Sequence, residues 1–177
     1  PELLGELNKI EKLQWIRLLY CYPDRITDGL INEFATNPKL VKYIDMPIQH
    51  ISTPVLKRMN RRDTSESIKN VIAKLRAAVP EIVLRSTVIV GFPGETEKQF
   101  NELRKFLKET KFERLGAFEY SREEGTPAYD MPDQVSQNTK KKRCEAIMSD
   151  QNRIHNDFNA KFVGKKMRVI CEGYDPV

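Results

Sequence analysis

The sequence is poor in cysteine, and the cysteines that it has stand far apart. Three occur in 177 residues, Cys21, Cys144 and Cys171, and their spacings match neither a metal-binding nor a disulfide pattern. Isolated reduced thiols are typical of a reducing compartment, so we expect a cytoplasmic protein. The cysteine pattern by itself predicts no metal site.

Long hydrophobic runs are also missing. No apolar stretch approaches the roughly 20 residues that a helix needs to span a bilayer, and the opening residues, PELLGELNKI, resemble a helix and not a signal peptide. Apolar residues make up 40% of the chain and charged residues 31%, which is typical of a soluble globular protein without a membrane partner. We expect one core and a monomer.

A lysine is missing where a phosphate-binding loop would need one. Residues 87–96, TVIVGFPGET, have the pattern of a strand, a glycine-rich turn and the start of a helix. A P-loop carries Lys after its last glycine, whereas Glu95 follows Gly94 here, and Pro93 lacks a backbone N–H. A phosphate site, and with it a phosphate-binding barrel isomerase, is therefore disfavoured.

Aromatic residues are few, at 8%, and they are not interleaved with the basic runs at 57–58, 61–62 and 140–143. A net charge of +5 permits an RNA or ribosomal partner, but single-stranded RNA is usually held by aromatic platforms among basic residues. The simpler interpretation of these runs is a set of solvated helix faces. A non-catalytic RNA- or ribosome-binding module stays open as an alternative.

What the sequence does contain is a regular alternation of strands and helices. Short apolar runs cover 16–22, 43–48, 83–90 and 115–120. Helical patterns cover 66–79 and 96–109, with Thr64 and Ser65 as an N-cap region and Pro80 as a stop. The alternation predicts an α/β fold with parallel strands at about 15–21, 42–48, 82–91 and 114–120, in sequential order with outer helices.

The end of the chain follows a different pattern. Residues 136–163 predict a long polar helix. After Gly164, the side chains of Met167, Val169 and Cys171 fall on one face of an alternating pattern, which predicts one strand of a β module that the chain does not complete. Because an edge strand without partners is a liability, we expect a fragment of a longer protein, cut at both ends.

Each predicted strand has one apolar face and one face that carries a charge, if side chains alternate with a period of two. The charge-bearing faces of the four strands, in chain order, contain Arg17 and Cys21; Asp45, Pro47 and Gln49; Arg85, Thr87, Ile89 and Gly91; and Ala117, Glu119 and Ser121. A sheet covered on both faces has continuously apolar strands, so charges on every strand favour a barrel interior lined with balanced charge. The alternative is a purely structural ion network.

Gln49 and His50 are expected at the rim of this interior, where ligands of such barrels bind. Pro47 supports a strand end just before them, because proline cannot donate a ladder hydrogen bond. A single histidine is more often structural than catalytic, so the pattern gives His50 no chemical role. The catalytic residues stay unknown at this point.

Several of these stretches together resemble one enzyme family. TVIVGFPGETEKQF resembles the fifth-strand region of radical S-adenosylmethionine enzymes. YIDMPIQH, VLKRMNRRDT and RLGAFEYSREEGTPAYDMPDQV narrow the resemblance to the methylthiotransferases, and to the RimO type more than the MiaB type. The first type modifies an aspartate of protein twelve of the small ribosomal subunit, and the second modifies an adenosine of transfer RNA. Gln49-His50 favours the first type, because the transfer-RNA enzymes tend to have Gln-Ser-Gly there.

The resemblance implies a fold, a cofactor and its contacts. It implies a partial, open TIM-like barrel of parallel strands at 1–146, a connecting helix at 147–163 and the first strand of a truncated TRAM domain at 164–177. S-adenosylmethionine would be the ligand, and Gly91, lacking a Cβ, would let the adenosine come close to the backbone. The residues that the resemblance places at the cofactor are Gln49, His50, Arg85, Thr87, Ile89, Gly91 and Glu119.

One departure from the family pattern limits what this chain can do alone. The three cysteines of a Cys-x3-Cys-x2-Cys motif, which hold the family's [4Fe-4S] cluster, are absent and would lie upstream of Pro1. We therefore expect the parent protein to be the enzyme, and this chain alone to hold no cluster and to be inactive. The expected partner is a small-subunit ribosomal protein, with transfer RNA as the alternative.

Overall fold

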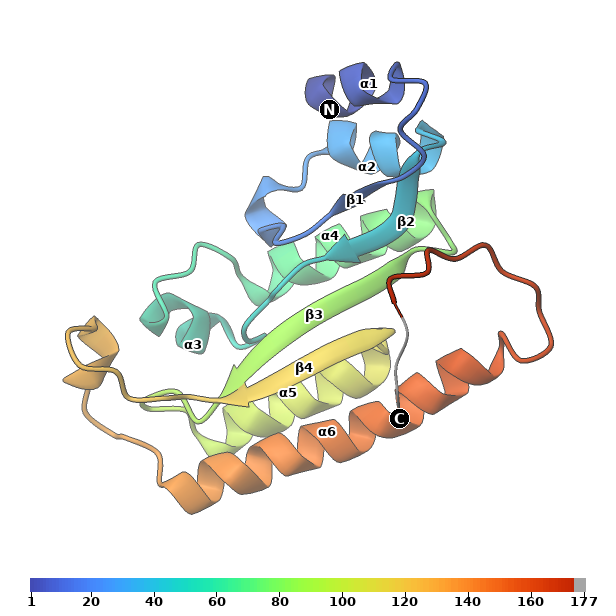
Figure 1. Ribbon diagram of the computed structural model, residues 1–177. Coiled ribbons are helices and arrows are strands. Elements are labelled where there is room, and N and C mark those ends of the chain that lie inside the picture. The colour runs from blue at the N-terminus through green and yellow to red at the C-terminus, as the bar shows by residue number, and fades with distance from the viewer. Residues whose placement is uncertain (174–177) are drawn as a thin grey trace.

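The computed structural model describes residues 1–173 of the chain and contains one sheet of four parallel strands (Figure 1). The strands are β1 (Ile16–Leu18), β2 (Leu40–Asp45), β3 (Val83–Val90) and β4 (Arg114–Glu119). They lie in the order β1-β2-β3-β4, and every neighbouring pair is parallel. The predicted sequential order of parallel strands is confirmed.

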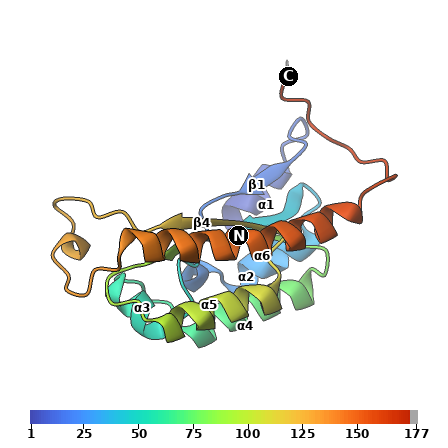
Figure 2. The same ribbon diagram turned by 90° about the horizontal axis from the view of Figure 1, so that it is seen from below.

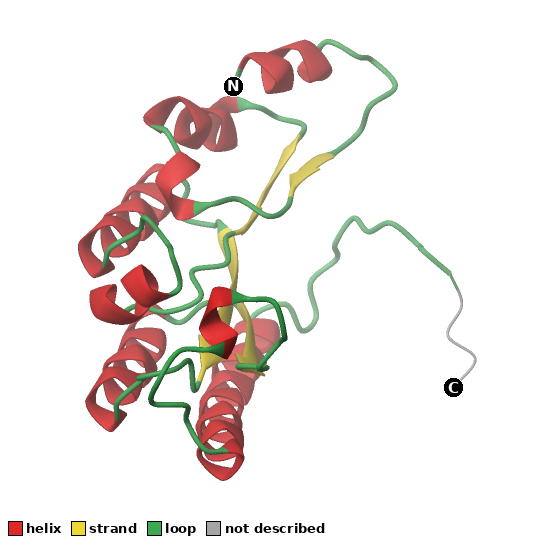
Figure 3. Ribbon diagram, turned by 90° about the vertical axis from the view of Figure 1, so that its left-hand side faces the viewer, coloured by secondary structure: helices red, strands yellow, loops and turns green. Residues whose placement is uncertain are grey.

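Helices follow the strands and cover one face of the sheet, as Figure 3 shows for α2, α4 and α5. The helical elements are α1 (Glu2–Asn8), η1 (Pro23–Arg25), α2 (Asp28–Thr36), α3 (Thr53–Arg58), α4 (Ser65–Ala78), α5 (Glu97–Thr110), η2 (Pro127–Tyr129) and α6 (Gln137–Ala160). Figure 2 shows α6 alongside β4 and α5, both of which it contacts. The opposite face of the sheet is left largely open by the described part of the chain, like the inside of a barrel that has not closed.

The two central helices both begin at a threonine cap, and the first of these caps lies at the predicted position, Thr64. The Thr64 side chain accepts a hydrogen bond from the Ser67 N–H, and the Thr96 side chain accepts one from the Gln99 N–H, so each helix has a capping box. Each cap is worth about 1 kcal/mol. The helices predicted at 66–79 and 96–109 are confirmed within one residue at either end.

The core lies between the sheet and these helices. Ile44 of β2 and Leu84 of β3 are fully buried, and so are Leu75 of α4 and Leu103 of α5. The apolar face of each central strand packs on the helices, which leaves the other face of the same strand toward the open side. The core therefore fixes which side chains face a ligand.

The end of the chain differs from the prediction. Residues 165–173 carry no strand, because no second strand lies beside them in the described residues to pair with their backbone; residues 174–177 lie outside the described residues. The predicted boundary between residues 146 and 147 falls inside α6, which is continuous from Gln137 to Ala160. The domain limits and the TRAM assignment stay predictions. None of the helices in residues 1–173 combines the length and apolar composition required to cross a bilayer.

Candidate functional site

The open face of the sheet carries the charged residues of β1, β2 and β3. The strand register pairs Asp45 with Arg85, whose Nε lies 3.8 Å from the Asp45 Oδ1. The Arg17 guanidinium lies 4.1 Å from the centre of the Tyr43 ring. A hydrogen bond with Tyr43 and, to a smaller extent, the Asp45 carboxylate raise the pKa of Arg85. The predicted polar face is confirmed for these three strands.

The predicted face is wrong for β4. The register pairs Ile89 with Phe118 and Val90 with Glu119, so Glu119 lies on the helix side and Phe118 lies on the open side. Phe118 is 59% exposed because no helix of the described residues covers that face. Glu119 instead accepts a hydrogen bond from Gln137, at the start of α6. A polar contact with a distant helix thus reverses the hydrophobic pattern of an edge strand.

A cleft of about 630 Å³ lies beyond the carboxyl ends of the strands. Its walls include Gln49, Ile89, Phe92, Phe118, Glu119 and Tyr120. The Phe92 and Tyr120 rings meet edge to face, 5.1 Å apart, and give one side of the cleft an aromatic wall. The position and volume suit a small organic ligand.

Gln49 presents an unsatisfied acceptor at this cleft. Its backbone has a φ of +65°, which is strained for a residue with a side chain. Two hydrogen bonds hold it there, from its N–H to the Thr87 carbonyl (2.9 Å) and from the Ile89 N–H to its carbonyl (2.8 Å). The Oε1 atom of Gln49 is buried and has no hydrogen-bond partner in residues 1–173. A buried acceptor of this kind is costly unless a ligand donates to it.

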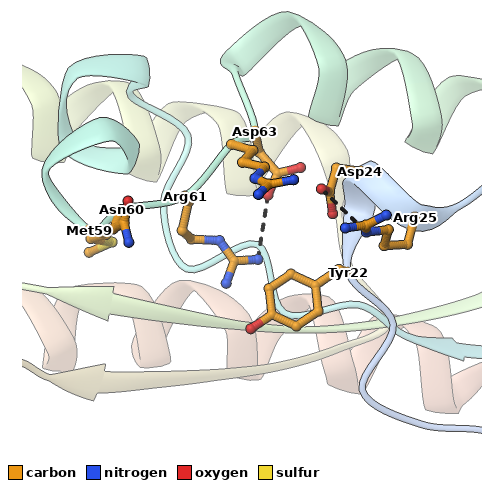
Figure 4. A pocket seen from close by; sticks show the side chains of 8 residues that line it. Tyr22, Asp24, Arg25, Met59, Asn60, Arg61 and Asp63 are labelled. Atoms are coloured by element: carbon orange, nitrogen blue, oxygen red, sulfur yellow. Dashed lines mark ion pairs between the residues drawn. The ribbon is translucent and has the colours of Figure 1, made fainter.

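A smaller pocket of about 300 Å³ adjoins the cleft across residues 59–61, which line both (Figure 4). The Arg61 guanidinium lies 4.7 Å from the centre of the Tyr22 ring, and its Nη2 lies 3.5 Å from Asp63 Oδ2. Nη2 also donates to the Pro47 carbonyl at 2.9 Å, but the buried Nε finds no partner in the described residues. Burial raises the pKa of Asp63, and Arg61 opposes that rise. Arg61 is not among the residues predicted from sequence, because its only signal there is its place in the basic run RR.

His50 and Gly91 do not face the cleft. His50 is fully buried and lies against Glu95, whose carboxylate accepts a hydrogen bond from the Gly91 N–H. A Cβ on Gly91 would lie 2.3 Å from the Lys140 Cγ, so the space beside this glycine is filled by α6. A ligand therefore cannot approach Gly91 from the side of the missing Cβ, and a contact of Gly91 with the adenosine stays a prediction. The Gly91 N–H of the glycine-rich turn thus binds the carboxylate of Glu95, which belongs to the same turn.

Of the predicted cofactor residues, the cleft brings together Gln49, Ile89 and Glu119. Thr87 and Arg85 lie one and two steps below Ile89 along the open face of β3. Among the described residues no group of three or more His, Cys, Asp or Glu side chains is placed to hold a metal ion.

Consecutive parallel strands, helices on the outer face and a ligand-sized cleft at the carboxyl ends define a partial β/α barrel of the ligand-binding kind. The chain belongs to the radical SAM superfamily, whose family model matches residues 1–107. The predicted resemblance is thereby confirmed for the superfamily.

Two relatives of high similarity carry the same name. The chain is 54% identical over 175 residues to "Ribosomal protein uS12 methylthiotransferase RimO" of Caldanaerobacter subterraneus subsp. tengcongensis, covering 99% of this chain and 40% of that protein. It is also 54% identical over 172 residues to the protein of the same name from Geobacter sulfurreducens, covering 97% of this chain and 38% of that protein. The chain thus spans about two fifths of the length of the curated relatives it matches.

Solved structures support the fold independently. Coproporphyrinogen III oxidase (HemN) from Escherichia coli, described as a radical SAM enzyme, superposes with a TM-score of 0.58 at 18% identity, covering 85% of this chain and 34% of that one. Elp3 of Methanocaldococcus infernus gives a TM-score of 0.58 at 14% identity, with 85% and 35% covered. At these identities the likeness concerns the fold alone.

Proposed function

We propose that this chain supplies the S-adenosylmethionine cleft of a cytoplasmic radical SAM methylthiotransferase that modifies an aspartate of small-subunit ribosomal protein S12. The observation that carries the proposal is the cleft itself, with the unpartnered Oε1 of Gln49 in its wall at the carboxyl ends of the strands. The similarity to proteins named as uS12 methylthiotransferases supports the choice of substrate.

The cleft fits the cofactor in volume and in chemistry. Ile89 and the Phe92–Tyr120 pair offer an apolar, aromatic wall to an adenine ring. The Gln49 Oε1 suits an amine or hydroxyl donor, and the unpartnered Nε of Arg61 suits a carboxylate. When bound, S-adenosylmethionine and an iron–sulfur cluster supply the radical chemistry, while this chain binds and orients the cofactor.

The cysteines of this chain do not fit a [4Fe-4S] cluster. Cys21 and Cys144 are half-buried single thiols, and burial raises the pKa of each, which disfavours the thiolate that iron needs. We therefore assign no cluster ligand to this chain. The residues that we propose for the cofactor are Gln49 and Ile89 in the cleft, with Thr87 and Arg85 below it; Glu119 is left out because its carboxylate is bonded to Gln137 on the helix side.

The proposal is tested with the whole protein that contains this chain, reconstituted with iron and sulfide and supplied with S-adenosylmethionine and a reductant. Purified S12 and transfer RNA are offered separately, and both are analysed by mass spectrometry. We expect a methylthio group on an aspartate of S12 and none on transfer RNA. Modification of an adenosine would instead assign the transfer-RNA activity, and failure to bind S-adenosylmethionine would overturn the cofactor assignment.

A single variant tests the role of Gln49. Gln49→Leu removes the acceptor but keeps the volume, so we expect the Kd for S-adenosylmethionine to rise about tenfold, since one hydrogen bond to a charged or polar ligand is lost. Gln14→Leu, on the exposed surface before β1, is the matched control and should leave the Kd unchanged. Equal affinities of the two variants for S-adenosylmethionine would show that Gln49 does not bind the cofactor.

A further inference from the structure

Helix α6 brings two buried cations to the region behind the cleft. Lys140 and Arg143 are each 6% exposed, although they belong to the run KKKR, whose other members, Lys141 and Lys142, are exposed. The interpretation of this run as a solvated face is therefore wrong for the first and last residues. Lysine and arginine are almost never fully buried unless they are paired, so each of these two cations is expected to have a specific partner.

Arg143 pairs with the buried Glu95 at the turn after β3. Its Nη1 lies 3.4 Å from Glu95 Oε2 and donates to the Glu95 carbonyl at 3.1 Å, while its Nη2 donates to Glu97 Oε2 at 3.0 Å. Glu95 is only 4% exposed and also accepts the Gly91 N–H. The carboxylate thus joins α6 to both ends of the glycine-rich turn.

Glu95 in turn faces His50, the neighbour of Gln49. The His50 Nδ1 accepts a hydrogen bond from the Ser52 N–H at 2.9 Å, so in the neutral ring the proton sits on Nε2. That Nε2 lies 3.6 Å from Glu95 Oε1, and neither atom has a hydrogen-bond partner in the described residues. Each atom therefore has the other as its natural partner, and the side chains of Arg143, Glu95 and His50 form one buried row that ends beside Gln49.

Lys140 acts on the other wall of the cleft. Its stem fills the space beside Gly91, and its Nζ donates to the Tyr120 carbonyl at 2.8 Å and lies 4.9 Å from the centre of the Tyr120 ring. Tyr120 lines the same cleft as Gln49. One helix thus holds two walls of the same cleft through side chains that never reach its interior.

We propose that Arg143 and Lys140 of α6 are positioning residues for the cofactor, Arg143 acting on Gln49 through Glu95 and His50, and Lys140 acting on Tyr120. The inference rests on the proposed function, because the ligand that Gln49 meets is taken to be S-adenosylmethionine. The row keeps the strained backbone of Gln49 in place before any ligand arrives, so that binding does not have to order it.

The first test compares variants along α6 in the whole protein. Arg143→Met should weaken S-adenosylmethionine binding about tenfold and move the backbone amide signal of Gln49, and Arg143→Lys should restore much of both. Arg153→Met, exposed on the same helix, controls for charge, and Ile147→Val, buried on α6, controls for stability. Both controls should leave the affinity and the Gln49 signal as they are. If Arg143→Met fails to fold, the double variant Glu95→Gln/Arg143→Met removes both charges and is compared in its place.

The second test reads the state of His50 directly in the 177-residue chain. The chain has two histidines, so a ¹⁵N–¹H correlation spectrum of the imidazoles resolves His50 against His155. We expect the Nε2–H tautomer for His50 and slow exchange of that proton with water.

Two variants of His50 test the same contact by affinity. His50→Gln keeps a hydrogen-bond donor at a similar distance from Glu95 and should retain cofactor affinity, whereas His50→Leu should lose about as much affinity as Arg143→Met.

Two results would overturn the inference. In the first, Arg143→Met and Ile147→Val lose the same amount of stability, and Arg143→Met loses no more affinity for S-adenosylmethionine than Ile147→Val does. The row would then contribute to stability alone and not to the position of Gln49. The other is the Nδ1–H tautomer at His50, which would break the row. Neither result touches the proposed function, which fails only if the unaltered protein does not bind S-adenosylmethionine or does not modify S12.

Discussion

Gly91 shows how much of this site depends on single residues. Its φ is +73°, and the Lys140 stem occupies the volume where a side chain would begin. The sequence shows that a glycine ends an apolar run, which predicts a turn, but not what lies against it, because the contact comes from a helix far along the chain. An alternating pattern describes only the strand itself, and long-range packing decides what its last residue meets.

Gly91→Ala should therefore destabilise the chain by about 2–4 kcal/mol, from the left-handed backbone together with the clash against Lys140 Cγ. The measurement is urea unfolding at neutral pH. Gly125→Ala is the matched control, since Gly125 has a similar φ of +78° but no atom within 4 Å of the added Cβ. The control should cost only about 1 kcal/mol. Equal costs would mean that Lys140 yields freely and that α6 is not tightly held at this glycine.

At the scale of elements, α5 and α6 are joined by a charged contact at the edge of the sheet. The Arg104 Nε donates to Asp150 Oδ2 at 2.6 Å, and the Lys108 Nζ lies 3.3 Å from the same oxygen. The hydrogen bond from Arg104, with Lys108 second to it, lowers the pKa of Asp150 below its usual 3.8. A lowered pKa in the folded state means that the contact stabilises the fold above about pH 4 and is lost as the pH falls through the folded pKa.

Asp150→Asn should accordingly cost about 1 kcal/mol at pH 7, a modest value because Arg104 and Lys108 are partly exposed. The difference from the unaltered chain should begin to shrink as the pH falls below about 4 and should vanish as the pH passes through the lowered pKa of folded Asp150. Urea unfolding from pH 3 to 7 measures this. Asp157→Asn, at an exposed position of the same helix, should show no such pH dependence. A constant difference at all pH values would show that Asp150 contributes by shape and not by charge.

The elements also show why some predictions succeed and others fail. The cap at Thr64 is predicted correctly because a cap is a local interaction between neighbours in sequence. Strict alternation assigns Glu119 and Phe118 to the wrong faces, because β4 is an edge strand whose surroundings are set by α6 and by an open face. Met167 and its alternating neighbours do not make a strand within the described residues, because a strand needs a partner that residues 1–173 do not provide.

For the whole molecule, the order of the strands follows from the strand–helix alternation and the handedness of the crossovers, and both can be inferred from sequence. The position of the cleft follows as well, because ligands of such sheets bind at the carboxyl ends, and Gln49 lies there as expected. The back wall of the cleft cannot be inferred from sequence, because Lys140, Arg143 and Glu95 meet only after the chain has folded.

The sheet should also open unevenly. β3 is eight residues long and lies between two strands, with residues 83–85 paired to β2 and residues 85–90 paired to β4, whereas β1 has three residues at an edge and a shift in its register with β2. We expect backbone amides of β3 to exchange with solvent at least about a hundredfold more slowly than those of β1. Hydrogen exchange followed by mass spectrometry measures this on the intact chain. Uniform protection of both strands would indicate that the sheet opens only as a unit.

Helix α6 has a mechanical consequence. It is 24 residues long without a break, and a helix of that length spans about 36 Å. Lys140 and Arg143 lie near one end of this rod, so a tilt of about 5° that pivots at these two residues moves the Ala160 end by about 2.5 Å. A force on the chain beyond Ala160 that tilts α6 would therefore rotate Lys140 and Arg143, and shift with them both walls of the cleft, at the same time.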